Sequence, residues 1–170
     1  ELYTMDVVVA EKGVSSDSKK VRFGVRELSY ELEVCFPDDS IRRVEYRPTV
    51  MGQGEPIFDN INRKYIEGGM CMPRLKKNVS SDILVPAPDK AMQHYMVIKV
   101  NGKRIFCKGG NWGMDDAMKR VSREHLEPYF RLHKEANFNM IRNWTGESTE
   151  ESFYELCDEY GMLVFNDFWL

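Results

Sequence analysis

The chain has 170 residues, of which 42% are hydrophobic and 30% charged, and its formal net charge is -3. This composition is ordinary for a globular protein of one or two small domains, and it lacks the basic excess that would predict a nucleic acid or an anionic membrane surface as partner. No apolar run approaches the roughly 20 residues that cross a bilayer.

Cysteine and histidine are too scattered to form a recognisable motif. The 4 cysteines and 3 histidines include no close pair of the kind that metal and redox sites need. We therefore predict no metal site and no cofactor. The cysteines are expected to be free thiols that fill small spaces in the core.

Residues 1–36 carry β-strand signals throughout, interrupted by a predicted polar turn at 13–18. Their clearest pattern is an apolar residue at every second position, in Leu28, Tyr30, Leu32, Val34 and Phe36. Antiparallel strands with one buried face are typical of a β-sandwich. Because so few strands cannot complete a sandwich, further sequence is expected before Glu1.

Residues 37–93 lose this regularity and are predicted to form an irregular insertion or linker. Prolines interrupt the segment repeatedly, at Pro37, Pro48, Pro56, Pro73, Pro86 and Pro88. Its apolar content nevertheless favours an ordered excursion over a flexible linker.

Residues 94–170 read as parallel β/α units. The dipeptide Asn101-Gly102 lies between two apolar runs and predicts a tight hairpin. Apolar runs at 104–107, 138–142 and 162–165 then alternate with two helical segments, which is typical of a parallel sheet. We expect the opening of a larger barrel or doubly wound sheet, with a glycine-rich loop at 108–113.

Both helices have recognisable ends. The first is predicted to begin after Ser122 as N-cap and to run to about Glu135. The second begins with a capping box made by Ser148 and Glu151, and Gly161 supplies its left-handed C-terminal position.

Candidate binding residues follow the predicted parallel strands. In parallel α/β folds, ligands bind where the carboxyl ends of the strands meet. Aromatic rings and planar polar groups gather at those ends, in Asn111 and Trp112, Arg142 and Trp144, and Asp167 and Trp169. Aromatic faces beside such donors and acceptors suit a polyhydroxylated ligand such as a sugar.

Several of these segments match a known enzyme family. They read VNGK at 100–103, KGGNW at 108–112, FNMIRNW at 138–144, FYELCDEYG at 153–161 and NDFW at 166–169. They resemble glycoside hydrolase family 2, most closely its β-mannosidase, endo-β-mannosidase and exo-β-glucosaminidase branch. The segment VRFGVRE at 21–27 resembles the final strand of that family's immunoglobulin-like domain.

The resemblance implies three regions. Residues 1–36 would be the C-terminal strands of an immunoglobulin-like β-sandwich, 37–93 the insertion or linker, and 94–170 the first three βα units of a (β/α)8 TIM barrel. The whole protein would be a retaining glycosidase that uses two carboxylates about 5 to 5.5 Å apart. The family places these after the fourth and seventh barrel strands, so we assign no catalytic residue within this chain and expect the chain alone to be inactive.

The resemblance also implies supporting roles at the sugar site. Arg142 would orient the nucleophile, unless it forms only a structural ion pair. Asp167 and Trp169 would build the sugar subsite beside Asn111, and Trp112 and Trp144 would wall it. The implied partners are a carbohydrate substrate and the rest of the same polypeptide, and the family implies export to the periplasm or cell exterior.

A second interpretation stays open at this point. The chain could be a non-catalytic carbohydrate-binding or interaction module that carries the same aromatic residues. An apolar third parallel strand without a neighbour argues against this alternative, because such an edge favours aggregation.

Overall fold

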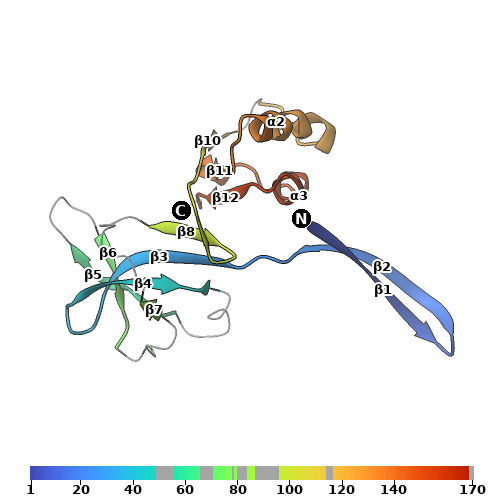
Figure 1. Cartoon of the computed structure of the whole chain (residues 1–170). Coiled ribbons are helices and arrows are strands. Elements are labelled where there is room, and N and C mark those ends of the chain that lie inside the picture. Colours follow the sequence, from blue (N-terminus) through green and yellow to red (C-terminus); the bar gives the residue numbers. More distant parts are fainter. Residues whose placement is uncertain are drawn as a thin grey trace. The chain divides into compact units, whose positions relative to one another are not determined.

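The computed structural model describes residues 1–48, 56–65, 71–77, 79, 84–86, 96–113 and 117–168. They form two compact units, one of residues 1–25 with 107–170 (unit 1) and the other of residues 26–106 (unit 2). Most of the described structure is β-sheet, accompanied by two α-helices, α2 and α3 (Figure 1).

Unit 1 contains the predicted parallel sheet. Strands β10 (Gly109–Trp112), β11 (Met140–Asn143) and β12 (Leu163–Asn166) pair in that order, all parallel. Helix α2 (Arg123–Glu135) connects the first two strands and α3 (Glu151–Tyr160) the last two. The predicted β-α-β-α-β order is therefore confirmed for this part of the chain.

The first parallel strand lies later than predicted. The run at 104–107 contributes instead to β9 (Lys103–Ile105), which pairs antiparallel in unit 2, and the expected glycine-rich loop is β10. A Cβ atom on Gly109 would lie 1.8 Å from the carbonyl oxygen of Met140. Glycine here permits the close approach of two backbones.

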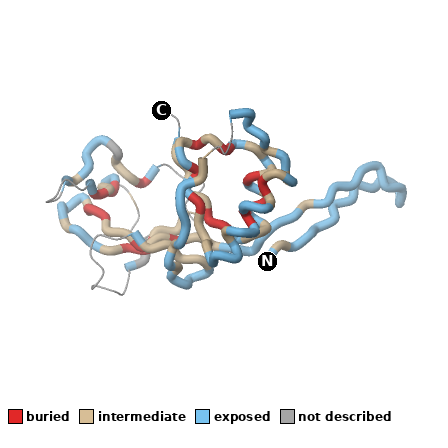
Figure 2. Tube along the Cα trace, turned by 90° about the horizontal axis from the view of Figure 1, so that it is seen from above, coloured by how far each residue is buried: buried red, intermediate tan, exposed pale blue. Residues whose placement is uncertain are grey.

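The helices cover one face of this sheet. The buried core of unit 1 consists of Leu126, Phe130, Ile141, Phe153, Leu156, Cys157 and Met162. Figure 2 shows this buried stretch in red along the helices and strands. Full burial of such a side chain contributes about 1.5–3 kcal/mol, so this layer fixes the sheet against α2 and α3.

The helix ends test the capping predictions. Ser122 is the N-cap of α2, and its side chain accepts a hydrogen bond from the amide of His125. The prediction of a capping box at the start of α3 was wrong, because Glu150 occupies the N-cap position and its side chain makes no capping hydrogen bond. Gly161 ends α3 with a left-handed φ of 70°, as predicted.

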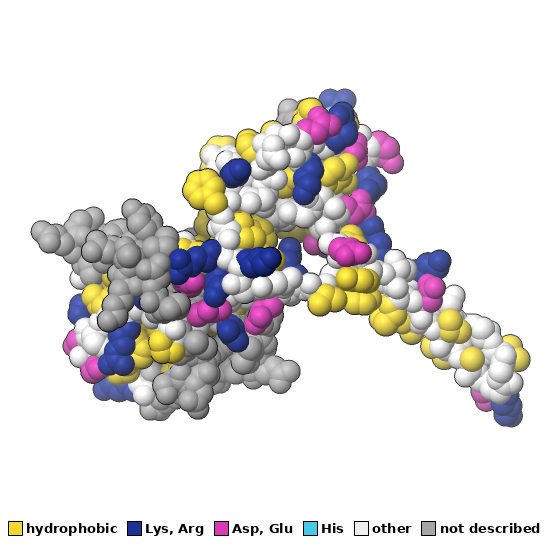
Figure 3. All heavy atoms as spheres, in the orientation of Figure 1, with side chains coloured by type: hydrophobic (Ala, Val, Ile, Leu, Met, Phe, Trp, Pro, Cys, Tyr) yellow, Lys and Arg dark blue, Asp and Glu magenta, His cyan; other side chains and the backbone are white. Residues whose placement is uncertain are grey.

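Unit 1 also includes a long hairpin. Strands β1 (Leu2–Glu11) and β2 (Val14–Gly24) pair antiparallel through a turn with positive φ at Lys12 and Gly13, shorter than the predicted turn at 13–18. Figure 3 shows hydrophobic side chains along this hairpin, and several are largely exposed, such as Val9 at 57%. Arg22 of β2 forms ion pairs with Glu155 and Glu159 of α3.

Unit 2 is one sheet of seven strands among the described residues. Besides β9, these are β3 (Leu28–Cys35), β4 (Ile41–Tyr46), β5 (Phe58–Tyr65), β6 (Cys71–Leu75), β7 (Leu84–Pro86) and β8 (Val97–Val100). Four of them, β4 to β7, lie within 37–93. The prediction that this segment is irregular is thus corrected, while its interpretation as an ordered excursion holds for these strands.

One face of the unit 2 sheet is apolar. Val34, Val44, Ile57 and Leu75 form its buried apolar cluster. The hairpin between β8 and β9 turns at Asn101 and Gly102, both with positive φ, as the sequence predicts.

All four cysteines are free thiols, as predicted, but they are not all buried. Cys35 and Cys157 are buried, Cys107 is half-buried and Cys71 is exposed, which corrects the prediction for that residue. Burial raises the pKa of the Cys157 thiol to about 12, so this thiol is inert at neutral pH. No helix among the described residues is long and apolar enough to cross a membrane.

Candidate functional site

The strand register sorts the predicted site residues onto two faces. Successive side chains of a strand point to opposite faces, and the pairing aligns Asn111 with Arg142 and Trp112 with Asn143. Asn111 and Arg142 are exposed on the face away from the helices, whereas Asn143 is buried on the helix side with 1% of its surface exposed. The strands therefore end in two separate sets of polar side chains.

Arg142 and Asp167 meet at the carboxyl ends of neighbouring strands. The Nη2 and Nε atoms of Arg142 donate to the two carboxylate oxygens of Asp167, at 2.9 and 3.2 Å. The backbone amide of Thr145 donates to Asp167 Oδ2 at 3.1 Å. Such a two-point pair fixes the plane of the guanidinium as well as its position.

Hydrogen bonds stabilise the charged form of Asp167. The Arg142 guanidinium, followed by the Thr145 amide, holds the pKa of Asp167 below its ordinary value. The side chain of Arg142 is 45% exposed, and three of its five N–H groups lie beyond the bonds to Asp167. The arrangement can therefore present an oriented cation to an anionic or polar group that approaches from the open face.

Trp144 follows β11 directly and remains accessible. It lies in a 3-10 turn (Trp144–Gly146) and is 48% exposed. Thr145 within this turn has a φ of 54°, which is unusual for a β-branched residue and directs its amide toward Asp167. The turn thus places an exposed indole directly after the Arg142 strand.

A buried network that the sequence did not reveal holds this loop in place. The Asn143 side-chain amide donates to the carbonyl of Ser148 at 2.8 Å and to Asn166 Oδ1 at 2.9 Å. Its oxygen accepts from the Ser148 amide at 3.1 Å. The Ser148 hydroxyl, predicted as a cap, accepts instead from Trp112 Nε1 at 3.1 Å. The only sequence signal for this network was an asparagine at the end of each of two adjacent strands.

The structure does not bring all predicted site residues together. Trp112 lies on the helix side, where its ring contacts Phe130 and Phe153 at centroid distances of 5.1 and 5.4 Å. It therefore cannot wall the same surface as Asn111 and Arg142. Trp169 lies outside the described residues. Among those described, no group of three potential metal ligands comes together.

Parallel strands joined by helices, with polar groups at their carboxyl ends, define the class of α/β folds that bind ligands at that edge. No family model matches the chain. Among curated proteins, it is 44% identical over 75 residues to a mannosylglycoprotein endo-β-mannosidase of Lilium longiflorum, covering 44% of this chain and 8% of that protein. It is 28% identical over 170 residues to β-mannosidase B of Aspergillus clavatus, covering 92% and 20%.

A mammalian β-mannosidase is similar to the chain over a segment of about the same length. The chain is 42% identical over 72 residues to the β-mannosidase of Mus musculus, covering 41% of this chain and 8% of that protein. The resemblance to the β-mannosidase branch of glycoside hydrolase family 2 is thus confirmed by curated relatives. The chain spans at most about a fifth of the length of these relatives.

Proposed function

We propose that the chain is part of a retaining glycoside hydrolase that cleaves β-mannosidic or β-glucosaminidic bonds. The acid/base and nucleophile carboxylates would be supplied by sequence outside Glu1–Leu170. In this proposal, the chain contributes the end of an immunoglobulin-like domain and the first three βα units of a TIM barrel. The names of its relatives, β-mannosidase and endo-β-mannosidase, support the reaction class.

The observation that carries the proposal is the pair of Arg142 and Asp167 at adjacent strand ends. A retaining mechanism needs an ionised carboxylate nucleophile held in a fixed orientation. An arginine whose plane is already fixed by a second carboxylate can supply that orientation through its remaining donors, without reorganising during the reaction. Asn111 on the same open face and the exposed ring of Trp144 would contact the sugar, and Trp169 is proposed to contribute after β12.

The test is hydrolysis of 4-nitrophenyl β-mannoside and 4-nitrophenyl β-glucosaminide by the full-length protein. We expect Arg142→Ala to lower kcat by about a hundredfold or more, as loss of a donor to transition-state charge does. Arg142→Lys is expected to restore little, since lysine cannot make the two-point pair. Arg131→Ala is the matched control, because Arg131 forms an exposed pair with Glu135 on α2.

Two results would contradict the proposal. Equal turnover by Arg142→Ala and Arg131→Ala would leave Arg142 as a structural ion pair only. Saturable sugar binding by a full-length protein that hydrolyses neither compound would favour the non-catalytic carbohydrate-binding module.

A further inference from the structure

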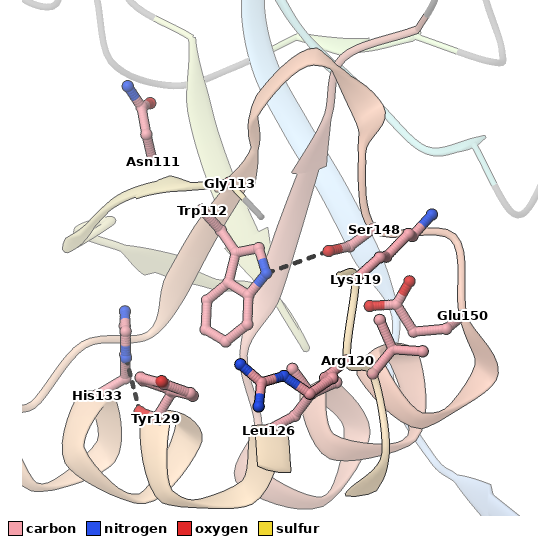
Figure 4. Close-up of a pocket in the computed structure, with 11 residues that line it drawn as sticks. Asn111, Trp112, Gly113, Lys119, Arg120, Leu126, Tyr129, His133, Ser148 and Glu150 are labelled. Carbon is pink, nitrogen blue, oxygen red and sulfur yellow. Dashed lines mark hydrogen bonds between the residues drawn. The ribbon is translucent and has the colours of Figure 1, made fainter. Parts of the chain in front are cut away.

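A pocket of about 160 Å³ lies on the helix side of the parallel sheet, opposite the open face that carries Arg142. Trp112 lies in the middle of this pocket. Asn111, its neighbour in the strand, also lines the pocket, but its side-chain amide points away from the indole (Figure 4). The remaining walls come from α2, from the segment before it and from the start of α3. Of the residues that line this pocket, only Asn111 takes part in the function proposed above, through its side chain on the open face.

Two further aromatic rings extend the wall that Trp112 begins. The ring of Tyr129 lies 6.0 Å from that of Trp112 and nearly perpendicular to it, at 89°. His133, one helical turn further along α2, lies 5.7 Å from the indole. Tyr129 is 38% exposed, so solvent reaches this wall. Flat aromatic surfaces with an open side are suited to contact the C–H faces of a ring.

The hydrogen bonds already made at the wall determine which polar atoms remain for a ligand. The Nδ1 atom of His133 lies 2.7 Å from the backbone carbonyl of Tyr129, and a carbonyl can only accept, so Nδ1 carries the proton. In the neutral ring, Nε2 is then an acceptor. The indole Nε1 of Trp112 already donates to Ser148, so the indole offers a ligand its apolar surface.

Charged groups complete the lining with both donors and acceptors. The carboxylate of Glu150 can only accept at neutral pH, whereas the ammonium of Lys119 and the guanidinium of Arg120 can only donate. A hydroxyl group both donates and accepts, so a ring bearing several hydroxyls can contact groups of both kinds.

We propose that this pocket binds one pyranose ring of a neutral carbohydrate, apart from any site of hydrolysis. Its volume of about 160 Å³ would hold roughly five waters at ~30 Å³ each, space on the scale of a single sugar ring. Trp112, Tyr129 and His133 contact the C–H faces, and Glu150 accepts from hydroxyls at the rim. The proposal does not depend on the hydrolase function, since it requires binding alone.

The test is calorimetric titration of the chain with methyl β-D-mannopyranoside and methyl β-D-glucopyranoside. We expect saturable binding of at least one of them, weakened about tenfold by Tyr129→Ala, which removes the exposed aromatic wall. Glu150→Gln is expected to weaken binding by a similar factor, since it replaces a charged acceptor. Leu132→Ala and Glu151→Gln are the matched controls, because both residues are exposed on the same helices and neither lines the pocket.

Three outcomes would overturn the proposal. No saturable binding of either sugar would do so, as would equal affinities for the pocket variants and their controls. Binding abolished by Arg142→Ala but unaffected by Tyr129→Ala would place the sugar on the open face, which rejects the pocket while supporting the function proposed above. Conversely, a hydrolytically inactive full-length protein with a Tyr129-dependent sugar site would reject the hydrolase and keep the pocket.

Discussion

The two units bury polar side chains in opposite ways. In unit 1, the buried network around Asn143 consists of neutral amides, hydroxyls and an indole N–H, and each donor meets a neutral acceptor. In unit 2, the face opposite the apolar cluster carries charges, and Glu31, with 2% of its surface exposed, lies opposite Glu45 in the pairing of β3 with β4.

Cations from three strands surround the two carboxylates of unit 2. Arg104 donates from Nε and Nη2 to the Glu31 carboxylate, at 2.9 Å in both bonds. Lys99 lies 2.7 Å from Glu45 and 3.8 Å from Glu31, and Arg43 lies 3.6 Å from Glu31. Two like charges directly opposite each other on paired strands destabilise a sheet unless cations separate them.

The difference teaches which changes each unit can tolerate. A neutral, hydrogen-bonded network costs less to desolvate than a charged one, and its groups do not titrate near neutral pH. A buried ionic network is costly to desolvate and depends on every partner being present, because the loss of one leaves an uncompensated charge. Unit 2 is therefore expected to be the more sensitive unit, both to single substitutions and to acid.

The largest expected effect is that of Glu31→Gln. Removing the charge leaves the buried guanidinium of Arg43 beside a neutral amide and takes away the carboxylate that holds the more exposed Arg104, so the free energy of unfolding should fall by about 3–5 kcal/mol. Urea denaturation, monitored by hydrogen exchange of the backbone amides of β3 and β4, measures this loss in unit 2. Asp38→Asn is the control, since Asp38 pairs with Arg42 while both side chains are more than half exposed, and it should leave the denaturation midpoint unchanged. A similar midpoint for both variants would mean that the ionic face contributes no stability.

A smaller loss is expected from Asn143→Ala in unit 1. The substitution leaves the backbone amide and carbonyl of Ser148 buried without their side-chain partner, at a cost of about 1–3 kcal/mol. Trp112 and Trp144 lie in unit 1, so their fluorescence during denaturation reports this change. Asn111→Ala, which alters an exposed asparagine one strand away, is the matched control for stability. If the two variants denature at the same urea concentration, the network does not hold the loop after β11.

The features that the sequence predicted correctly depend on short-range signals. The N-cap at Ser122, the turn at Asn101-Gly102 and the left-handed Gly161 each need only a few neighbouring residues. The alternation of apolar runs with helical periodicity likewise gave the order of the parallel sheet.

The features that were missed depend on partners distant in sequence. The strand at Gly109 becomes apparent only when Met140 lies beside it, because a glycine-rich segment has no β propensity of its own. Because this strand was predicted at 104–107 instead, the alternation of side chains that points Trp112 toward the helices was missed as well. For the site itself, the sequence correctly placed Arg142 and Asp167 at the ends of adjacent strands. The role of Ser148 was missed, because only its contact with Asn143 distinguishes it from a residue that caps a helix.

The smallest expected effect is on the response to acid, and it sharpens the contrast between charged and neutral burial. The bond from Lys99, followed by that from Ser29, holds the pKa of Glu45 below its ordinary value of 4.5. A lowered folded-state pKa adds stability above pH 4.5 that is lost as the pH falls through the folded value. One such group changes stability by at most about 1.4 kcal/mol per pH unit. Glu45→Gln should therefore be less stable at pH 7 and show a shallower decline between pH 5 and pH 3, measured by urea denaturation at each pH. An unchanged slope would mean that Glu45 binds its proton equally well in the folded and unfolded chain, and that the acid sensitivity of unit 2 comes from another carboxylate of the same face.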